Sequence, residues 1–273
     1  MTKTTTDTAA PGPRIVTARD GAVVTLTVNR PEARNALDAE TVDAVIAALD
    51  AIERDASVRC AILTGAGERA FAAGADIKAM AGMGPEEARA FAERGHRMGD
   101  MLEGVRVPVI AAVNGFALGA GLELALACDF IYAARTAKLG MPEVGLGVIP
   151  GFGGTQRLAL RVGVARAREL IYSGAVIDAD EGLRIGLCNA VTEPDALVPR
   201  VRALAAQIAG HAPLAVAAAK QTVTPGAPRG PDQAFATALA FERDRFAALF
   251  ATHDQKEGMR AFVEKRPPTW KGA

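Results

Sequence analysis

Residues 105–134 read VRVPVIAAVNGFALGAGLELALACDFIYAA, an apolar stretch interrupted by glycines and single polar residues. The apolar run at 107–113 predicts a strand, which ends at an Asn114–Gly115 turn. Small residues from Gly119 onward predict the start of a helix, and 129–133 predict a second strand. Acids inside the stretch argue against a membrane-spanning helix, because a central acid costs about 2.5–3.5 kcal/mol on insertion. We interpret the stretch as a buried strand, turn, helix and strand.

The same alternation of strands and helices extends toward the N-terminus. A β-branched run at 23–28 and an apolar run at 59–64 predict two further strands. Helices are predicted over 38–54, where Asp38 is a candidate N-cap, and over 85–102, where a proline suits the first turn. Strands that alternate with helices indicate an α/β core with parallel strand pairing.

The C-terminal part of the chain is different, with a helical pattern from about residue 195 onward. Helices are predicted at 195–210, 213–223, 230–250 and 254–265. We therefore divide the chain into a disordered leader at 1–14, a catalytic α/β core at 15–205 and a helical oligomerisation region at 206–273. From the pattern alone, packing of this last region on its own core is equally compatible.

Charge and cysteine usage narrow the possible partners. Lys plus Arg and Asp plus Glu number 31 each, so no net charge attracts nucleic acid or an anionic membrane, and neither is expected as a partner. Cys60, Cys128 and Cys188 are odd in number and far apart, without a CxxC motif. Reduced thiols in a cytoplasmic protein are the simplest interpretation.

Other catalytic motifs do not occur in the sequence. The two serines, Ser57 and Ser173, both lie outside any GxSxG motif, and the three histidines have no metal-ligand spacing. A GxxxxGK[ST] phosphate loop is also missing from the sequence. We therefore expect no metal site and no nucleotide cofactor.

Two carboxylates stand in apolar, glycine-rich surroundings: Glu123 and Glu143. An ionised carboxylate in an apolar segment costs several kcal/mol to desolvate, so a retained one has a partner or a task. The helix expected near Gly119 would begin with backbone N–H groups that lack intrahelical acceptors, which makes Ala120 a candidate oxyanion donor. Gly74 and Ala75 expose a second stretch of backbone just before Asp76, the expected N-cap of the next helix.

Two convergent N–H groups would polarise a thioester carbonyl, and a carboxylate on each side could move a proton and activate water. Simpler interpretations stay open for each residue taken alone. Glu123 could be a helix N-terminal acid satisfied by free N–H groups, and Glu143 a surface residue. Asp76 is more typical of a helix cap than of a catalyst. The co-occurrence of these features favours a catalytic site.

The motifs around these residues closely resemble the enoyl-CoA hydratase/isomerase (crotonase) family over about residues 15–270. The resemblance is carried by FAAGADIK at 71–78, AAVNGFALGAGLELA at 111–125, PEVGLGVIPGFGGTQR at 142–157, LTVNRP at 26–31, NAL at 35–37 and EGMRAFVEKR at 257–266. It implies a spiral of ββα turns with a C-terminal helical region, assembled as homotrimers that commonly pair into homohexamers.

The resemblance also implies roles for individual residues. Ala75 and Ala120 match the family's two oxyanion N–H positions, although the family often has glycine at the second, and a methyl group could narrow the site. Glu123 would hold and activate water, and Glu143 would deliver the α-proton. Residues along the coenzyme A and substrate would be Ala73, Ala75, Asp76, Ile77, Lys78 and Gly119. The segment at 80–104, with four methionines and Phe91, would line or cover the acyl pocket.

The presence of both acids helps to distinguish a hydratase from an isomerase of this family. An isomerase can shuttle one proton with the carboxylate at the Glu143 position, whereas a hydratase must also hold a water molecule. We therefore expect a lyase that reversibly hydrates trans-2-enoyl-CoA in syn fashion to 3-hydroxyacyl-CoA, with coenzyme A as part of the substrate and no other cofactor. Isomerisation, hydration of substituted acyl groups and C–C bond chemistry remain alternatives. A non-catalytic or RNA-binding relative is disfavoured by the neutral charge.

Overall fold

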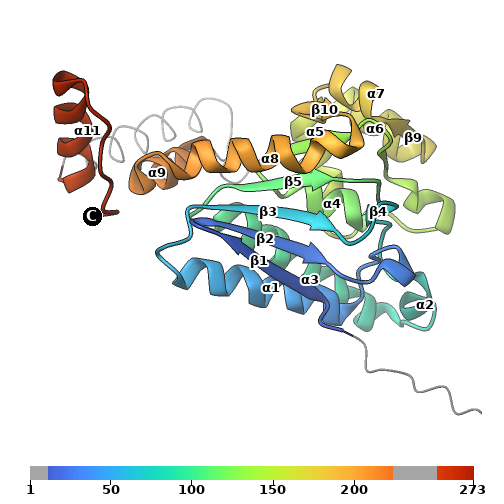
Figure 1. The fold of residues 1–273 in the computed structure, drawn as a ribbon. Coiled ribbons are helices and arrows are strands. Elements are labelled where there is room, and N and C mark those ends of the chain that lie inside the picture. Colours follow the sequence, from blue (N-terminus) through green and yellow to red (C-terminus); the bar gives the residue numbers. More distant parts are fainter. Residues whose placement is uncertain (1–11, 224–250) are drawn as a thin grey trace, which may run out of the picture.

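The computed structural model describes residues 12–223 and 251–273 (Figure 1). The helix predicted at 230–250 and most of the predicted leader lie outside these described residues. At the end of the predicted leader, Arg14 is already part of the fold, because its guanidinium pairs with Glu40 at 2.6 Å.

The larger of two sheets has six strands and is mainly parallel. In spatial order these are β1 (Ile15–Asp20), β2 (Val23–Val28), β3 (Cys60–Gly65), β5 (Val109–Val113), β7 (Phe130–Ala134) and β10 (Ala190–Thr192). Only the β1–β2 pair within this sheet is antiparallel. The predicted parallel α/β core is therefore confirmed.

A smaller sheet contains β4 (Ala70–Ala72), β6 (Phe116–Leu118), β8 (Lys138–Gly140) and β9 (Val176–Asp178). The first three are parallel, and β9 joins β8 antiparallel. Three times in succession, one strand of the larger sheet is followed along the chain by one strand of the smaller sheet and then by a helix. The successive strands are β3 and β4, β5 and β6, and β7 and β8. This repeated path is the ββα spiral that the sequence resemblance implied.

Helices fill the connections and cover the larger sheet. They are η1 (Pro31–Ala33), α1 (Ala39–Arg54), α2 (Ile77–Met80), α3 (Pro85–Gly104), α4 (Ala120–Leu126), η2 (Pro142–Leu146), α5 (Gly154–Val162), α6 (Val164–Ser173), α7 (Ala179–Arg184), α8 (Pro194–Ala209), α9 (Pro213–Val223) and α11 (His253–Glu264). Asp38 caps α1 as predicted, since its carboxylate accepts a hydrogen bond from the Thr41 N–H at 2.8 Å. Figure 1 shows α1 and α3 on one face of the sheet and α8 on the other.

The alternation of strand side chains divides the core between those two faces. On β3, Ala61 and Leu63 belong to the large cluster beneath the sheet, whereas Cys60 and Ile62 pack with buried residues of α8. Helix α8 continues without a break through residue 205, where we placed the end of the core.

Helix α9 is tied to the core by a buried cation. The Lys220 ammonium donates to the carbonyls of Leu102 and Val107 and pairs with Asp129 at 2.8 Å.

Among the described residues, no single helix has the length and hydropathy to cross a bilayer; only α8 and α9 together, bent by 109°, meet those criteria.

Candidate active site

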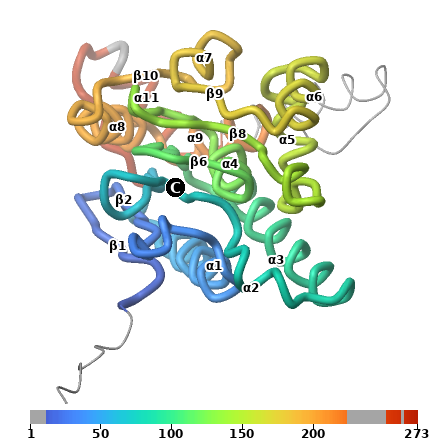
Figure 2. The backbone as a smooth tube through the Cα atoms, turned by 90° about the vertical axis from the view of Figure 1, so that its right-hand side faces the viewer, coloured from blue at the N-terminus to red at the C-terminus, as the bar shows by residue number. Residues whose placement is uncertain are grey.

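The start of α4 is built around a glycine that no other residue could replace without strain. Gly119 has φ of 49°, and a Cβ there would lie 2.7 Å from Oε1 of Glu143. Its N–H donates to the Gly140 carbonyl at 2.9 Å, which ties the helix start to β8. Figure 2 shows α4 beside β6 and β8. The predicted helix start near Gly119 is confirmed.

The N–H groups of Ala120 and Ala75 both lack acceptors in the part of the fold that the structure describes. Ala120 is the first residue of α4, so its N–H has no intrahelical acceptor. Ala75 forms a parallel bridge with Leu37, in which the hydrogen bonds come from the peptide groups of Gly74 and Asp76 on either side. The N–H of Ala75 therefore points away from Leu37. Neither N–H donates to any acceptor within residues 12–223 and 251–273.

These two donors come from neighbouring segments. Strands β4 and β6, which precede them, pair in parallel, and a Cβ on Gly74 would lie 3.5 Å from the Leu118 carbonyl oxygen. Helix α4 also sits directly on β4, since a Cβ on Gly121 would lie 1.8 Å from the Ala72 carbonyl oxygen. The carboxyl ends of adjacent parallel strands are a common place for ligands in open α/β sheets.

Glu123 is buried and held by the backbone of a later loop. The residue is only 2% exposed. Its Oε1 accepts hydrogen bonds from the N–H groups of Phe152 at 2.8 Å and Gly154 at 2.7 Å. The pKa of Glu123 is raised to about 7, and burial is the largest cause. The two N–H bonds and the Arg157 cation act to lower this pKa, whereas the nearby Glu143 carboxylate acts to raise it. A carboxyl group with this pKa can exchange a proton near neutral pH.

Glu143 lies at the start of η2, facing the first residues of α4. Its Oε2 is buried and has no hydrogen-bond partner among the described residues, while Oε1 approaches the Gly119 backbone. Desolvation raises the pKa of Glu143 as well. The structure thus brings both predicted carboxylates to the N-terminus of α4, where the Glu143 charge acts on Glu123.

The residues predicted to lie along the substrate have mixed surroundings. The Asp76 carboxylate caps α2 through the Lys78 and Ala79 N–H groups and pairs with Arg30 at 3.1 Å. Although burial opposes it, these bonds lower the pKa of Asp76. The Ala73 N–H is already used, donating to the Arg34 carbonyl at 3.0 Å. Ile77 and Lys78 are exposed on α2. Their contact with coenzyme A stays a prediction.

The donors that hold Glu123 were not predicted from the sequence. Phe152 and Gly154 lie in the glycine-rich segment at 151–154, to which the sequence assigns no role beyond its part in the family resemblance. Gly154 has to be small because a Cβ there would lie 2.7 Å from Cγ of Glu123. The only signal was the density of glycines, which permits close approach to a backbone N–H.

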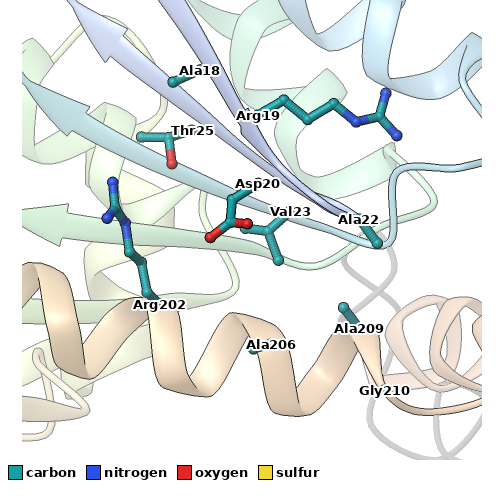
Figure 3. A pocket seen from close by; sticks show the side chains of 10 residues that line it. All are labelled: Ala18, Arg19, Asp20, Ala22, Val23, Thr25, Arg202, Ala206, Ala209 and Gly210. Carbon is teal, nitrogen blue, oxygen red and sulfur yellow. The ribbon is translucent and has the colours of Figure 1, made fainter.

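Two hollows in the described part of the molecule lie away from these carboxylates. One, of about 390 Å³, is bounded by β1, β2 and α8, with Asp20 and Arg202 on facing elements (Figure 3). The other, of about 490 Å³, lies among α5, α9 and the ends of α3 and α4. No group of three potential metal ligands occurs among the described residues. The three cysteines are free and buried, and burial raises the pKa of Cys60 to about 12.

The Glu123 pKa makes stability depend on pH in a defined direction. Folding raises this pKa from 4.5 to about 7, so the folded state favours the protonated form. The ionised carboxylate therefore destabilises the folded state. This destabilisation is absent below pH 4.5, grows in the window between pH 4.5 and about 7, and is complete above pH 7. Relative to the wild type, Glu123→Gln should therefore gain on the order of 3 kcal/mol of unfolding free energy across that window. Urea unfolding of both proteins at several pH values measures this difference, and a constant difference would contradict it.

Comparison with known proteins agrees with this architecture. The family model described as enoyl-CoA hydratase/isomerase matches residues 18–273. A short-chain-enoyl-CoA hydratase of Clostridium acetobutylicum is 47% identical, covering 92% of this chain and 95% of that protein. A crotonyl-CoA hydratase of Syntrophomonas wolfei is 46% identical with the same coverage.

The crystal structure of an enoyl-CoA hydratase from Bacillus anthracis superimposes with a TM-score of 0.90 at 41% identity, covering 95% of this chain and 100% of that one. The chain therefore belongs to the enoyl-CoA hydratase/isomerase family, and its fold is the crotonase-like α/β spiral with C-terminal helices. Within that family it resembles proteins named as enoyl-CoA hydratases, as the sequence motifs predicted.

Proposed function

We propose that this protein is an enoyl-CoA hydratase that reversibly adds water, in syn fashion, to trans-2-enoyl-CoA thioesters. The observation that carries the proposal is the proximity of Glu123 and Glu143, both with raised pKa, to two backbone N–H groups that lack acceptors among the residues the structure describes. The names of the similar proteins from Clostridium acetobutylicum and Syntrophomonas wolfei support the same reaction class.

The backbone N–H groups would act on the thioester. Donation from Ala75 and Ala120 to the carbonyl oxygen would draw electron density from the conjugated double bond, leaving C3 electrophilic. As negative charge moves onto that oxygen during addition, these hydrogen bonds strengthen. Both donors are fixed by the fold before substrate binds, so little reorganisation is needed when the charge develops.

The two carboxylates would divide the proton transfers. Oε1 of Glu123 is fixed by two N–H groups, whereas Oε2 makes no hydrogen bond among the described residues and can accept one from water. As the water oxygen bonds to C3, its proton passes to Glu123. Protonated Glu143 gives its proton to C2, which completes the addition. Exchange of the carboxyl protons with solvent then restores the starting state.

An assay with purified protein tests this proposal. Crotonyl-CoA should lose its enoyl thioester absorbance and give 3-hydroxybutyryl-CoA, identified by mass spectrometry. The isomer with a 3,4 double bond, 3-butenoyl-CoA, serves as the comparison substrate. Hydration of crotonyl-CoA supports the hydratase, whereas conversion of 3-butenoyl-CoA without any hydration would favour an isomerase that uses Glu143 alone. Short, long and branched acyl chains in the same assay would define acyl-chain preference.

We also propose a cytoplasmic homotrimer or homohexamer whose partner is the acyl-CoA substrate, with no separate cofactor, nucleic acid or membrane. Free, buried thiols support the cytoplasmic location. Light scattering should give three or six times the mass of the chain. A stable monomer at micromolar concentration would contradict this assembly.

A further inference from the structure

We propose that Arg157 is a positioning residue that holds the loop at 151–154 against α3 and thereby fixes the Glu123 carboxylate. The inference rests on the proposed function, because it gives Arg157 the role of orienting the catalytic carboxylate of Glu123. Arg157 itself does not touch Glu123 through any hydrogen bond. It acts through the backbone that does.

All three nitrogens of the Arg157 guanidinium form hydrogen bonds, which link that loop to α3. Its Nη1 donates to the Phe152 carbonyl at 2.9 Å, and Nε and Nη2 donate to the two carboxylate oxygens of Glu103 at 2.6 and 3.2 Å. The side chain is only 13% exposed. A second acid, Asp100, approaches Nη2 at 3.4 Å but is itself largely exposed. Bidentate pairing of this kind fixes a guanidinium in both position and plane.

Helix α3 has a glycine face that admits both the guanidinium and the neighbouring ring. Gly95 and Gly99 lie one helical turn apart. A Cβ on Gly95 would lie 2.0 Å from the Phe152 ring, and one on Gly99 would lie 2.7 Å from Nη2 of Arg157. Glycine inside a helix costs about 1 kcal/mol relative to alanine, and here the space it leaves is filled by these two groups. Phe91, on the same helix, packs edge-on against Phe152 with centroids 5.0 Å apart.

The same loop residue joins Arg157 to Glu123. Phe152 accepts from Arg157 through its carbonyl and donates to Oε1 of Glu123 through its N–H. Gly153, with φ of 97°, wraps the guanidinium so closely that a Cβ would lie 2.2 Å from Nη1. Gly154 then supplies the second N–H to Glu123. Any displacement of the guanidinium is therefore transmitted to both donors.

Charge acts in the same direction as geometry. Around Glu123, the carboxylate of Glu143 on η2 raises its pKa, and the cation of Arg157 on α5 lowers it, as do the loop N–H groups. The acids of α3, Glu103 and Asp100, face Arg157. Loss of Arg157 should therefore loosen the carboxylate and also raise the pKa of Glu123.

The test compares Arg157→Met and Arg157→Lys with Arg161→Met. Arg161 lies one turn farther along α5 and makes no hydrogen bond to the loop, so it is a matched control. For crotonyl-CoA hydration, Arg157→Met should lower kcat about 10- to 100-fold, with KM changed by less than about threefold, because misaimed catalytic groups lose rate rather than binding. The pH at which kcat rises should move upward. Arg157→Lys should recover part of the rate, and Arg161→Met should match the wild type.

Carboxyl NMR of Glu123 gives a readout that does not depend on activity. In Arg157→Met its titration should move to higher pH, and a titration and kcat equal to those of the wild type would overturn the positioning role. If Arg157→Met does not fold, Glu103→Gln replaces it, because it removes one half of the bidentate pair while keeping the Arg157 cation. Its kcat for crotonyl-CoA hydration should then fall with KM little changed, and a kcat equal to that of the wild type would overturn the positioning role. A wild type that hydrates no enoyl-CoA would instead contradict the proposed function, while the NMR comparison would still test Arg157.

Discussion

Glu123→Gln and Glu143→Gln should each lower kcat for crotonyl-CoA hydration about 10²- to 10⁴-fold, the range that general acid–base groups contribute. Glutamine keeps the shape of the side chain and can still accept the Phe152 and Gly154 N–H bonds, but it cannot gain or lose a proton. Neither substitution should lower the melting temperature, since each removes a carboxylate that burial disfavours when it is charged. Stopped-flow or steady-state absorbance and thermal unfolding measure the two effects.

A surface carboxylate provides the control for these variants. Within the described part of the chain, the Glu169 side chain pairs only with Arg166 on α6, and Glu169→Gln should leave kcat unchanged. A different outcome would favour an isomerase: hydration by Glu123→Gln near the wild-type rate, together with conversion of 3-butenoyl-CoA that depends on Glu143 alone. That result would replace the two-carboxylate account with a single proton shuttle.

Ala120→Pro should lower kcat about 10²- to 10³-fold, the loss found when one oxyanion donor is removed. Proline has no N–H, yet it is well tolerated at the first position of a helix, where that N–H has no intrahelical acceptor. Ala120 occupies this position in α4. The substitution therefore removes the proposed donor while keeping the helix, and circular dichroism can verify that the fold is retained.

Ala120→Gly is the matched variant, because it keeps the N–H and removes only the methyl group. The kcat of Ala120→Gly should be of the same order of magnitude as that of the wild type, or higher. If Ala120→Pro folded and hydrated crotonyl-CoA as fast as Ala120→Gly, the backbone N–H at this position would have no role in stabilising the oxyanion.

Much of the larger sheet was predictable because its strands are long and apolar. Strand β2 has the predicted bounds, and β3, β5 and β7 differ from prediction by one or two residues. The smaller sheet was not predicted, because β4, β6, β8 and β9 have only three residues each. Three residues are too few to establish a period-two pattern, so their pairing depends on where the longer strands place them.

The candidate site was likewise predictable only in part. Glu123, Glu143 and the helix start at Gly119 stood out locally, since acids and glycines are conspicuous in apolar sequence. The hydrogen bonds to Glu123 come from residues 29 and 31 positions later in the chain, which only the tertiary fold brings near. The expected acyl wall at 80–104 stays a prediction, although Phe91 and Met98 in that segment are buried in the core.

Crotonyl-CoA hydration in D₂O, followed by NMR of the product, tests the central arrangement most directly. If one carboxylate directs water to C3 while the other protonates C2 from the same side, the product should carry one deuterium at C2, on the face that received the hydroxyl group. Deuterium at C4, or at C2 on the opposite face, would contradict a pair of acids acting together on a single enoyl thioester.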